Sequence, residues 1–237
     1  LAVIGLGYVG LPLAVAMAGA GRRVTGFDID TRRIDELGAG VDRSGEVTAA
    51  ALNETAAIFT TDPAALQDHD AYIITVPTPI DAARKPDLSA VEAACRTVGK
   101  ALGRDAIVVL ESTVYPGTVE GVCGPVLAAE SGLVAGEDFW LGYSPERINP
   151  GDPEHRLENI IKVVAGQTAP VTAALCALYG AIGSVFEAAD IRTAEAAKVI
   201  ENAQRDINIA FVNELALIFD RLGLDTGAVL DAASTKW

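Results

Sequence analysis

Three glycines near the start of the chain have the spacing of a phosphate-binding turn. Gly5, Gly7 and Gly10 follow a short apolar run and precede an alanine-rich stretch, which is the order of a strand, a turn and a helix. In such a unit the first glycine permits the tight turn, the second lets a pyrophosphate approach the backbone, and the third lets the helix pack closely on the strand. The spacing alone also suits a glycine-rich turn with a purely structural role.

An acidic residue downstream favours the dinucleotide interpretation of this turn. Asp28 stands 18 residues after Gly10, at the end of the second apolar run, where dinucleotide-binding folds place an acid for the ribose hydroxyls. Its carboxylate repels a 2′-phosphate and therefore favours NAD as the cofactor. Arg32 and Arg33 leave NADP as an alternative cofactor, because a nearby arginine can bind that phosphate. The predicted cofactor contacts from these two segments are Gly5, Gly7, Tyr8, Val9, Gly10 and Asp28.

Candidate site residues lie at the ends of three later apolar runs, which are further predicted strands. Ligands of open parallel sheets bind at the carboxyl ends of the strands, so we expect these residues to face one crevice. They are Val76, Pro77 and Thr78, which close the fourth strand, Thr113 after the fifth, and Glu146 and Arg147 after the sixth. The alternatives are a turn stiffened by proline at 76–78 and a solvated ion pair at 146–147.

Lys198 and Asn202 lie one helical turn apart in a long predicted helix. At that spacing an ammonium group and an amide can both reach one oxygen atom. Glu195, Arg205 and Asp206 extend the same polar stripe. Without further support, an ordinary solvated helix face is the simpler explanation of the stripe.

Short β-branched runs alternate with alanine-rich stretches, and these elements must position the candidate residues. Near-continuous apolar strands separated by helices predict an α/β fold, a Rossmann-type doubly wound parallel sheet. Strands are predicted at 2–5, 23–28, 58–60, 71–76, 106–111, 139–143 and 161–165. Helices are predicted at 9–20, 31–37, 88–102, 118–131 and 169–182, with loops at 38–45 and 77–87.

The stretch 191–222 differs from the rest of the chain. It has no glycine or proline in 32 residues and carries two apolar stripes, which predicts one long helix that is apolar on two sides. Such a helix needs two partners, so we expect a homodimer formed through it. Gly223 ends the helix, and Asp225 or Thr226 caps a last short one.

Charge and cysteine content restrict the partners. The 237 residues carry 18 Lys and Arg against 32 Asp and Glu, a formal net charge of −14 that repels nucleic acid and anionic membrane surfaces. The uncharged segment 1–21 is interrupted by five glycines and Pro12, so we expect no membrane span there. Three cysteines without a CxxC pair indicate neither a disulfide framework nor a zinc site and fit a reducing cytoplasm. No metal site is expected.

Together these motifs resemble the UDP-glucose/GDP-mannose dehydrogenase family over the whole chain. The segments that carry the resemblance are GLGYVGLPLA at 5–14, TVPTPI at 75–80, KPDLSAV at 85–91, ESTVYPGT at 111–118, YSPERINPGD at 143–152 and AEAAKVIEN at 194–202. The form SPERINPGD is similar to the branch acting on UDP-N-acetylhexosamines, the UDP-N-acetylglucosamine 6-dehydrogenase branch. UDP-glucose members have a second Glu four residues after the Glu of this motif, where this chain has Pro150.

The resemblance implies an activity and roles for four residues. Members oxidise the C6 hydroxyl of a UDP-sugar to a carboxylate for polysaccharide biosynthesis, with four electrons passing to two NAD and with a cysteine-bound thiohemiacetal and thioester. By motif position, Lys198 and Asn202 would hold the substrate oxygen and stabilise its developing charge. Glu146 would assist thioester hydrolysis, and Thr113 would position a water beside the nicotinamide.

The resemblance also implies roles for two arginines and an order of domains. Arg147 would mark the amino-sugar branch, and Arg33 would contact the NAD phosphoribose. Residues 1–190 would form the NAD-binding Rossmann domain, and 191–237 would begin an all-α central dimerisation domain. The family's nucleophilic cysteine and its UDP-binding domain follow that helix and are not among these residues, so we expect the chain by itself to bind NAD without turnover.

Two other functions fit part of the pattern. A β-hydroxyacid dehydrogenase also joins a Rossmann domain to a long helix with a Lys and an Asn one turn apart, but it leaves the segments 111–118 and 144–152 unexplained. The second is a stand-alone NAD-binding or dimerisation module, which is consistent with the absence of the family's nucleophilic cysteine from these residues. Lys198, Asn202 and Glu146 favour an enzyme.

Overall fold

The computed structural model describes residues 1–148, 157 and 159–236. They form two compact units, Leu1–Ala196 and Ala197–Trp237. The first unit holds the sheet and its helices, together with the beginning of the long helix. The second unit holds the remainder of the long helix and the short helix that follows it.

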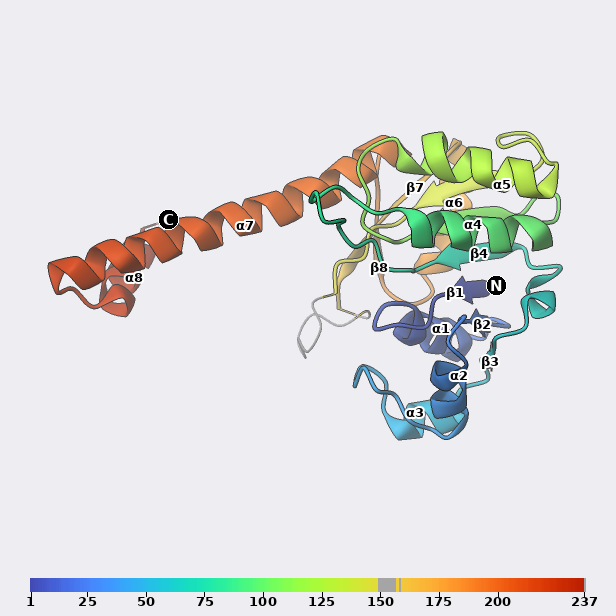
Figure 1. The fold of residues 1–237 in the computed structure, drawn as a ribbon, viewed down its shortest axis with the longest axis horizontal. Helices are drawn as coiled ribbons and strands as arrows, with labels where there is room; N and C mark the ends of the chain where they lie inside the picture. Colours follow the sequence, from blue (N-terminus) through green and yellow to red (C-terminus); the bar gives the residue numbers. More distant parts are fainter. Residues whose placement is uncertain (149–156, 158, 237) are drawn as a thin grey trace. The chain divides into compact units, whose positions relative to one another are not determined.

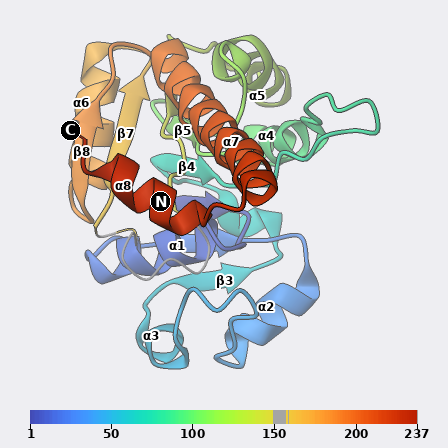
Figure 2. The same ribbon diagram turned by 90° about the vertical axis from the view of Figure 1, so that its left-hand side faces the viewer.

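A sheet forms the centre of the first unit (Figure 1 and Figure 2). It has eight strands. Its strand order is β3-β2-β1-β4-β5-β6-β7-β8, so the chain crosses over between the neighbours β1 and β4. The strands are β1 (Ala2–Ile4), β2 (Thr25–Phe27), β3 (Ile58–Thr60), β4 (Ala71–Ile74), β5 (Ile107–Leu110), β6 (Trp140–Tyr143), β7 (Ile161–Gly166) and β8 (Ser184–Glu187). Neighbouring strands are parallel in each described pair except β6–β7.

Helices cover both faces of the sheet, as its apolar strands require. The elements beside the strands are α1 (Gly10–Gly19), α2 (Thr31–Gly38), α3 (Ala49–Glu54), α4 (Ser89–Ala101), α5 (Gly124–Ser131) and α6 (Ala169–Tyr179), with a 3-10 turn η1 (Pro63–Leu66) and a π turn η2 (Val119–Cys123). α4 and α5 pack on the face that buries Ile4 and Leu110, and α1 and α6 pack on the face that buries Val3 and Val109 (Figure 1). This alternation along each strand confirms the predicted doubly wound arrangement.

The structure also contains elements that the sequence pattern does not reveal. α3 is six residues long, and β8 is an edge strand whose side chains are mostly exposed, so neither has the apolar pattern of a core element. The prediction of a parallel sheet is wrong for one pair, because β7 is antiparallel to β6, with Tyr143 opposite Ala165. Antiparallel neighbours need no crossover helix, and no helix is predicted between the strands at 139–143 and 161–165, so the predicted elements already contained a sign of this reversal.

The long helix has the limits that its sequence predicts. α7 (Ile191–Leu222) contains 32 residues, and Gly223 follows it with a φ of 69°. Asp225 caps α8 (Thr226–Ser234) by accepting a hydrogen bond from the Ala228 N–H at 2.7 Å. Apolar side chains remain exposed along the second unit. None of the described helices is both long enough and apolar enough to cross a membrane.

Candidate functional site

The glycine turn lies between β1 and α1, at the crossover point of the sheet. Gly5 has a φ of 91°, a left-handed conformation that glycine adopts without strain. A Cβ on Gly10 would lie 1.9 Å from the Gly5 carbonyl oxygen, so a glycine there is needed for the close approach of helix and turn. A Cβ on Gly7 would meet nothing within 4 Å, so the backbone is open on that side. No side chain caps α1, which leaves N–H groups for an anion.

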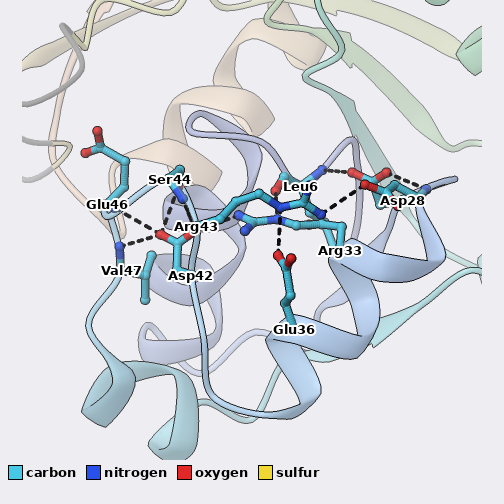
Figure 3. A network of polar contacts seen from close by, with 10 residues as sticks. Leu6, Asp28, Arg33, Glu36, Asp42, Arg43, Ser44, Glu46 and Val47 are labelled. Atoms are coloured by element: carbon cyan, nitrogen blue, oxygen red, sulfur yellow. Dashed lines mark hydrogen bonds and ion pairs between the residues drawn. The ribbon is translucent and has the colours of Figure 1, made fainter.

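Asp28 lies directly beside the glycine turn. It follows β2 and is half-buried. Its Oδ2 accepts a hydrogen bond from the Leu6 N–H at 2.7 Å, and its Oδ1 accepts one from the Asp30 N–H at 2.9 Å (Figure 3). The structure therefore brings together the predicted acid and the predicted turn, which also contains Val9 and the exposed Tyr8.

Arg33 supports the turn from inside the fold. It belongs to α2 and is 5% exposed. Its Nε donates a hydrogen bond to the Leu6 carbonyl at 2.7 Å, and its Nη2 lies 2.8 Å from Oδ1 of Asp42 (Figure 3). Nη1 is buried and has no hydrogen-bond partner among the described residues. This unpartnered donor fits the predicted cofactor contact, while the other two contacts give Arg33 a structural role as well.

Asp42 is a candidate that the sequence pattern does not reveal. Its buried carboxylate accepts hydrogen bonds of 2.7 to 2.9 Å from the N–H groups of Ser44, Glu46 and Val47 and from the Ser44 hydroxyl. Burial acts to raise the pKa of this carboxyl, but the hydrogen bonds and the Arg33 guanidinium lower it from 3.8 to about 2. The available signal is the Asp-x-Ser-Gly turn that begins here, inside a segment predicted only as a loop.

The ends of β4 and β5 are fastened to each other and to the glycine turn. Thr78 Oγ1 donates to the Thr113 carbonyl at 2.8 Å, and Ser112 Oγ donates to the Val76 carbonyl at 2.5 Å. Thr75 Oγ1 donates a hydrogen bond to the Gly5 carbonyl at 2.7 Å. Val76, Thr78 and Thr113 are thus brought to one sheet edge, with the exposed Pro77 between the first two.

Glu146 is held in place after β6. Its Oε1 accepts hydrogen bonds from the N–H groups of Arg147 at 2.6 Å and Ile148 at 2.5 Å, and its Oε2 lies 3.6 Å from Nζ of Lys162. A solvated ion pair does not describe this carboxylate, because its side chain is only 10% exposed. Pro150, on which the predicted distinction from UDP-glucose enzymes depends, lies outside the described residues.

A buried polar cluster lies behind Glu146. Nζ of Lys162 is 2.8 Å from Oε2 of Glu111, and the Tyr179 hydroxyl donates to Oε1 of Glu111 at 2.6 Å. Burial raises the pKa of Glu111, whereas the two carboxylates raise the pKa of Lys162 against the lowering effect of burial. The sequence signal is a lysine inside the apolar run 161–165, because a buried lysine needs a partner.

Glu195 corrects one prediction about the polar stripe of the long helix. Its side chain is buried, not solvated, and accepts hydrogen bonds from the N–H groups of Gly117 at 2.5 Å and Val119 at 2.9 Å. Burial raises its pKa. These hydrogen bonds connect the N-terminal part of α7 to the segment that follows Thr113.

Lys198 and Asn202 belong to the second unit. They are four residues apart on α7, so they lie one turn apart on the same side of that helix. Their joint role on a substrate oxygen stays a prediction.

The crossover between β1 and β4, the glycine turn and the acid after β2 define a Rossmann-type dinucleotide-binding protein. Residues 1–182 match the NAD binding domain of the UDP-glucose/GDP-mannose dehydrogenase family, and residues 192–237 match its central domain. The chain belongs to this family, and its cofactor is NAD.

Relatives with known names match the chain over its full length. It is 54% identical to Protein CapL of Staphylococcus aureus and 53% identical to UDP-N-acetyl-D-glucosamine 6-dehydrogenase of Salmonella typhi, in both cases over 100% of this chain and 56% of the relative. The solved structure of UDP-D-ManNAc dehydrogenase from Pyrococcus horikoshii matches with a TM-score of 0.92 at 34% identity, covering 99% of this chain and 57% of that one. The chain therefore spans little more than half the length of these relatives.

Proposed function

We propose that the whole protein to which this chain belongs oxidises the C6 hydroxyl of a UDP-N-acetylhexosamine to the uronic acid, in nucleotide-sugar and polysaccharide biosynthesis. The observation that carries the proposal is the 53% identity, over the whole chain, to a protein named UDP-N-acetyl-D-glucosamine 6-dehydrogenase. Conversion of an alcohol to a carboxylate removes four electrons, so each sugar requires two NAD.

The described residues fit NAD. The open backbone at Gly7 and the uncapped start of α1 suit the pyrophosphate, and the carboxylate of Asp28 suits the ribose hydroxyls. Bound NAD supplies the hydride acceptor. Asp28 also disfavours a 2′-phosphate, so we expect selectivity for NAD over NADP.

Five residues act on the substrate in this proposal. Lys198 and Asn202 hold the reacting oxygen and stabilise its negative charge. Thr113 positions a water, and Glu146 accepts a proton from water during hydrolysis of the acyl intermediate. Arg147 favours the amino sugar.

We assign residues 1–190 to the NAD-binding domain and 191–237 to the beginning of a central helical domain that forms a homodimer through α7. The support is a set of large apolar side chains that stay exposed on this helix, among them Ile207 at 66%, Phe211 at 61% and Leu222 at 65%. The cytoplasm is the proposed compartment, because the three cysteines are free thiols.

The test is the number of NADH formed per UDP-N-acetylglucosamine consumed by the whole protein at saturating NAD. Two NADH per sugar is the expected result, and Lys198→Ala should abolish turnover while Lys100→Ala, which changes an exposed lysine of α4, should not. One NADH would indicate a two-electron reaction of the β-hydroxyacid dehydrogenase kind. Turnover only with another UDP-hexose would overturn the amino-sugar assignment. If no UDP-sugar gave NADH, the protein would be a non-catalytic NAD-binding module.

A further inference from the structure

A cluster from three strands and one helix stands behind Glu146. Glu111 follows β5, Glu146 follows β6, Lys162 lies within β7 and Tyr179 ends α6. The roles given above for the reaction use Glu146 but none of the other three. Their burial is nevertheless complete, since none of the three is more than 1% exposed.

Lys162 is shared by the two carboxylates of the cluster. Its Nζ lies 2.8 Å from Oε2 of Glu111 and 3.6 Å from Oε2 of Glu146. The second oxygen of Glu111 accepts the Tyr179 hydroxyl, and the second oxygen of Glu146 accepts two backbone N–H groups. Each carboxylate therefore has one oxygen facing the ammonium and the other held by a fixed donor, which leaves little freedom of orientation.

The cluster has an excess of negative charge. Two carboxylates and one ammonium leave one net negative charge, and a buried charge without a partner is costly. Glu146 is the member with access to the surface, because its side chain is 10% exposed while those of Glu111 and Lys162 are 0% and 1% exposed.

Arg147 and Tyr143 are ionisable residues on the elements beside this cluster. Arg147 donates from Nη1 to the Ile161 carbonyl at 2.9 Å, at the start of β7. Tyr143, at the end of β6, donates its hydroxyl to the Ser112 carbonyl at 3.3 Å. Nζ of Lys162 lies 3.6 Å from Oε2 of Glu146 and so provides an ammonium group beside this carboxylate.

We propose that Lys162, held by Glu111 and Tyr179, is a positioning residue that keeps Glu146 oriented and ionised so that it can take one proton from water. The inference rests on the proposed function for the step in which that proton is taken. The electrostatic link between Lys162 and Glu146 rests on their distance alone.

The link is tested on the 237-residue chain by ¹³C NMR titration of the Glu146 carboxyl, assigned with Glu146→Gln. Lys162→Met removes the charge and retains the length of the side chain. The midpoint of the Glu146 titration should move to higher pH by about one to three pH units, the effect of losing an opposite charge at close range. Lys100→Met removes the same charge from an exposed site and should move the midpoint by less than about 0.3 pH units.

A second variant protects the test against loss of folding. Lys162→Met leaves two buried carboxylates facing each other, so Lys162→Met combined with Glu111→Gln removes one charge of each sign. The Glu146 midpoint should still be higher than in the unmodified chain, by less than in the single variant. A midpoint equal to that of the unmodified chain in both variants would overturn the inference.

The same variants separate this inference from the proposed function. In the whole protein, Lys162→Met should move the acid limb of the kcat–pH profile to higher pH. On that limb, kcat at a fixed pH should fall about tenfold for each pH unit by which the limb moves. The affinity for NAD should stay within about twofold. If no form of the protein oxidises a UDP-sugar but the NMR midpoint moves as expected, only the proposed function fails. If turnover occurs and the acid limb and the midpoint do not move, only this inference fails.

Discussion

Two buried ion pairs lie in the same domain, and they differ in charge balance. Arg33 meets one carboxylate, that of Asp42, whose remaining hydrogen bonds come from a turn of its own loop. Lys162 faces two carboxylates, those of Glu111 and Glu146. The balanced pair fixes the shape of the segment behind the glycine turn. The unbalanced cluster has one more carboxylate than it has ammonium groups.

This difference gives the two regions opposite dependences of stability on pH. The pKa of Asp42 is lowered from 3.8 to about 2, so its stabilising contribution is complete above the unfolded value and is lost as the pH falls through about 2. Burial raises the pKa of Glu111, so the folded state binds that proton more tightly than the unfolded state does. Its contribution to stability therefore decreases as the pH rises above the unfolded value.

The largest effect should come from removing the cation of the unbalanced cluster. Lys162→Met leaves two buried carboxylates without an ammonium, so the free energy of unfolding at pH 7 should fall by about 3–5 kcal/mol. Urea unfolding measures the change, with Lys100→Met as the exposed control. Equal stability of the two variants would show that Lys162 does not compensate the carboxylates.

Removing the carboxylate of the balanced pair should cost less and should depend on pH. Asp42→Asn is expected to lower the free energy of unfolding by about 2 kcal/mol at pH 7, from the linkage between its folded and unfolded pKa values. The difference from the unmodified chain should shrink as the pH falls from 4 toward 2, because the unmodified chain then loses the same contribution. Urea unfolding across this range, with the exposed Asp35→Asn as control, tests the expectation. A loss independent of pH would contradict it.

The elements around these pairs differ in how far the sequence could predict them. The glycine turn and α7 follow from local patterns, namely the spacing of Gly5, Gly7 and Gly10 and a run without glycine or proline. The buried polar clusters could not be predicted from local patterns, because their members are distant in the chain. Glu111 is 51 residues from Lys162 and 68 residues from Tyr179. Only the packing of β5, β7 and α6 brings these side chains together.

A small effect is expected from the outermost hydrogen bond of the unbalanced cluster. Tyr179→Phe removes the donor to Oε1 of Glu111 and leaves Lys162 in place. The free energy of unfolding should fall by about 1 kcal/mol, the usual contribution of a single hydrogen bond. Tyr8→Phe, which changes a tyrosine that is 47% exposed, is the matched control in the same urea unfolding measurement. A loss as large as that of Lys162→Met would show that the hydroxyl, not the ammonium, holds the cluster together.

We infer that the Arg33 pair supports the cofactor turn and that the Lys162 cluster does not. The most direct test is a calorimetric titration of NAD into the chain carrying Arg33→Met or Lys162→Met, with the exposed Arg32→Met as control. Loss of the donor to the Leu6 carbonyl should weaken NAD binding by about fivefold in Arg33→Met, while Lys162→Met and Arg32→Met should stay within about twofold of the unmodified chain. Equal losses of NAD affinity in Arg33→Met and Lys162→Met would contradict the inference that only the Arg33 pair supports the cofactor turn.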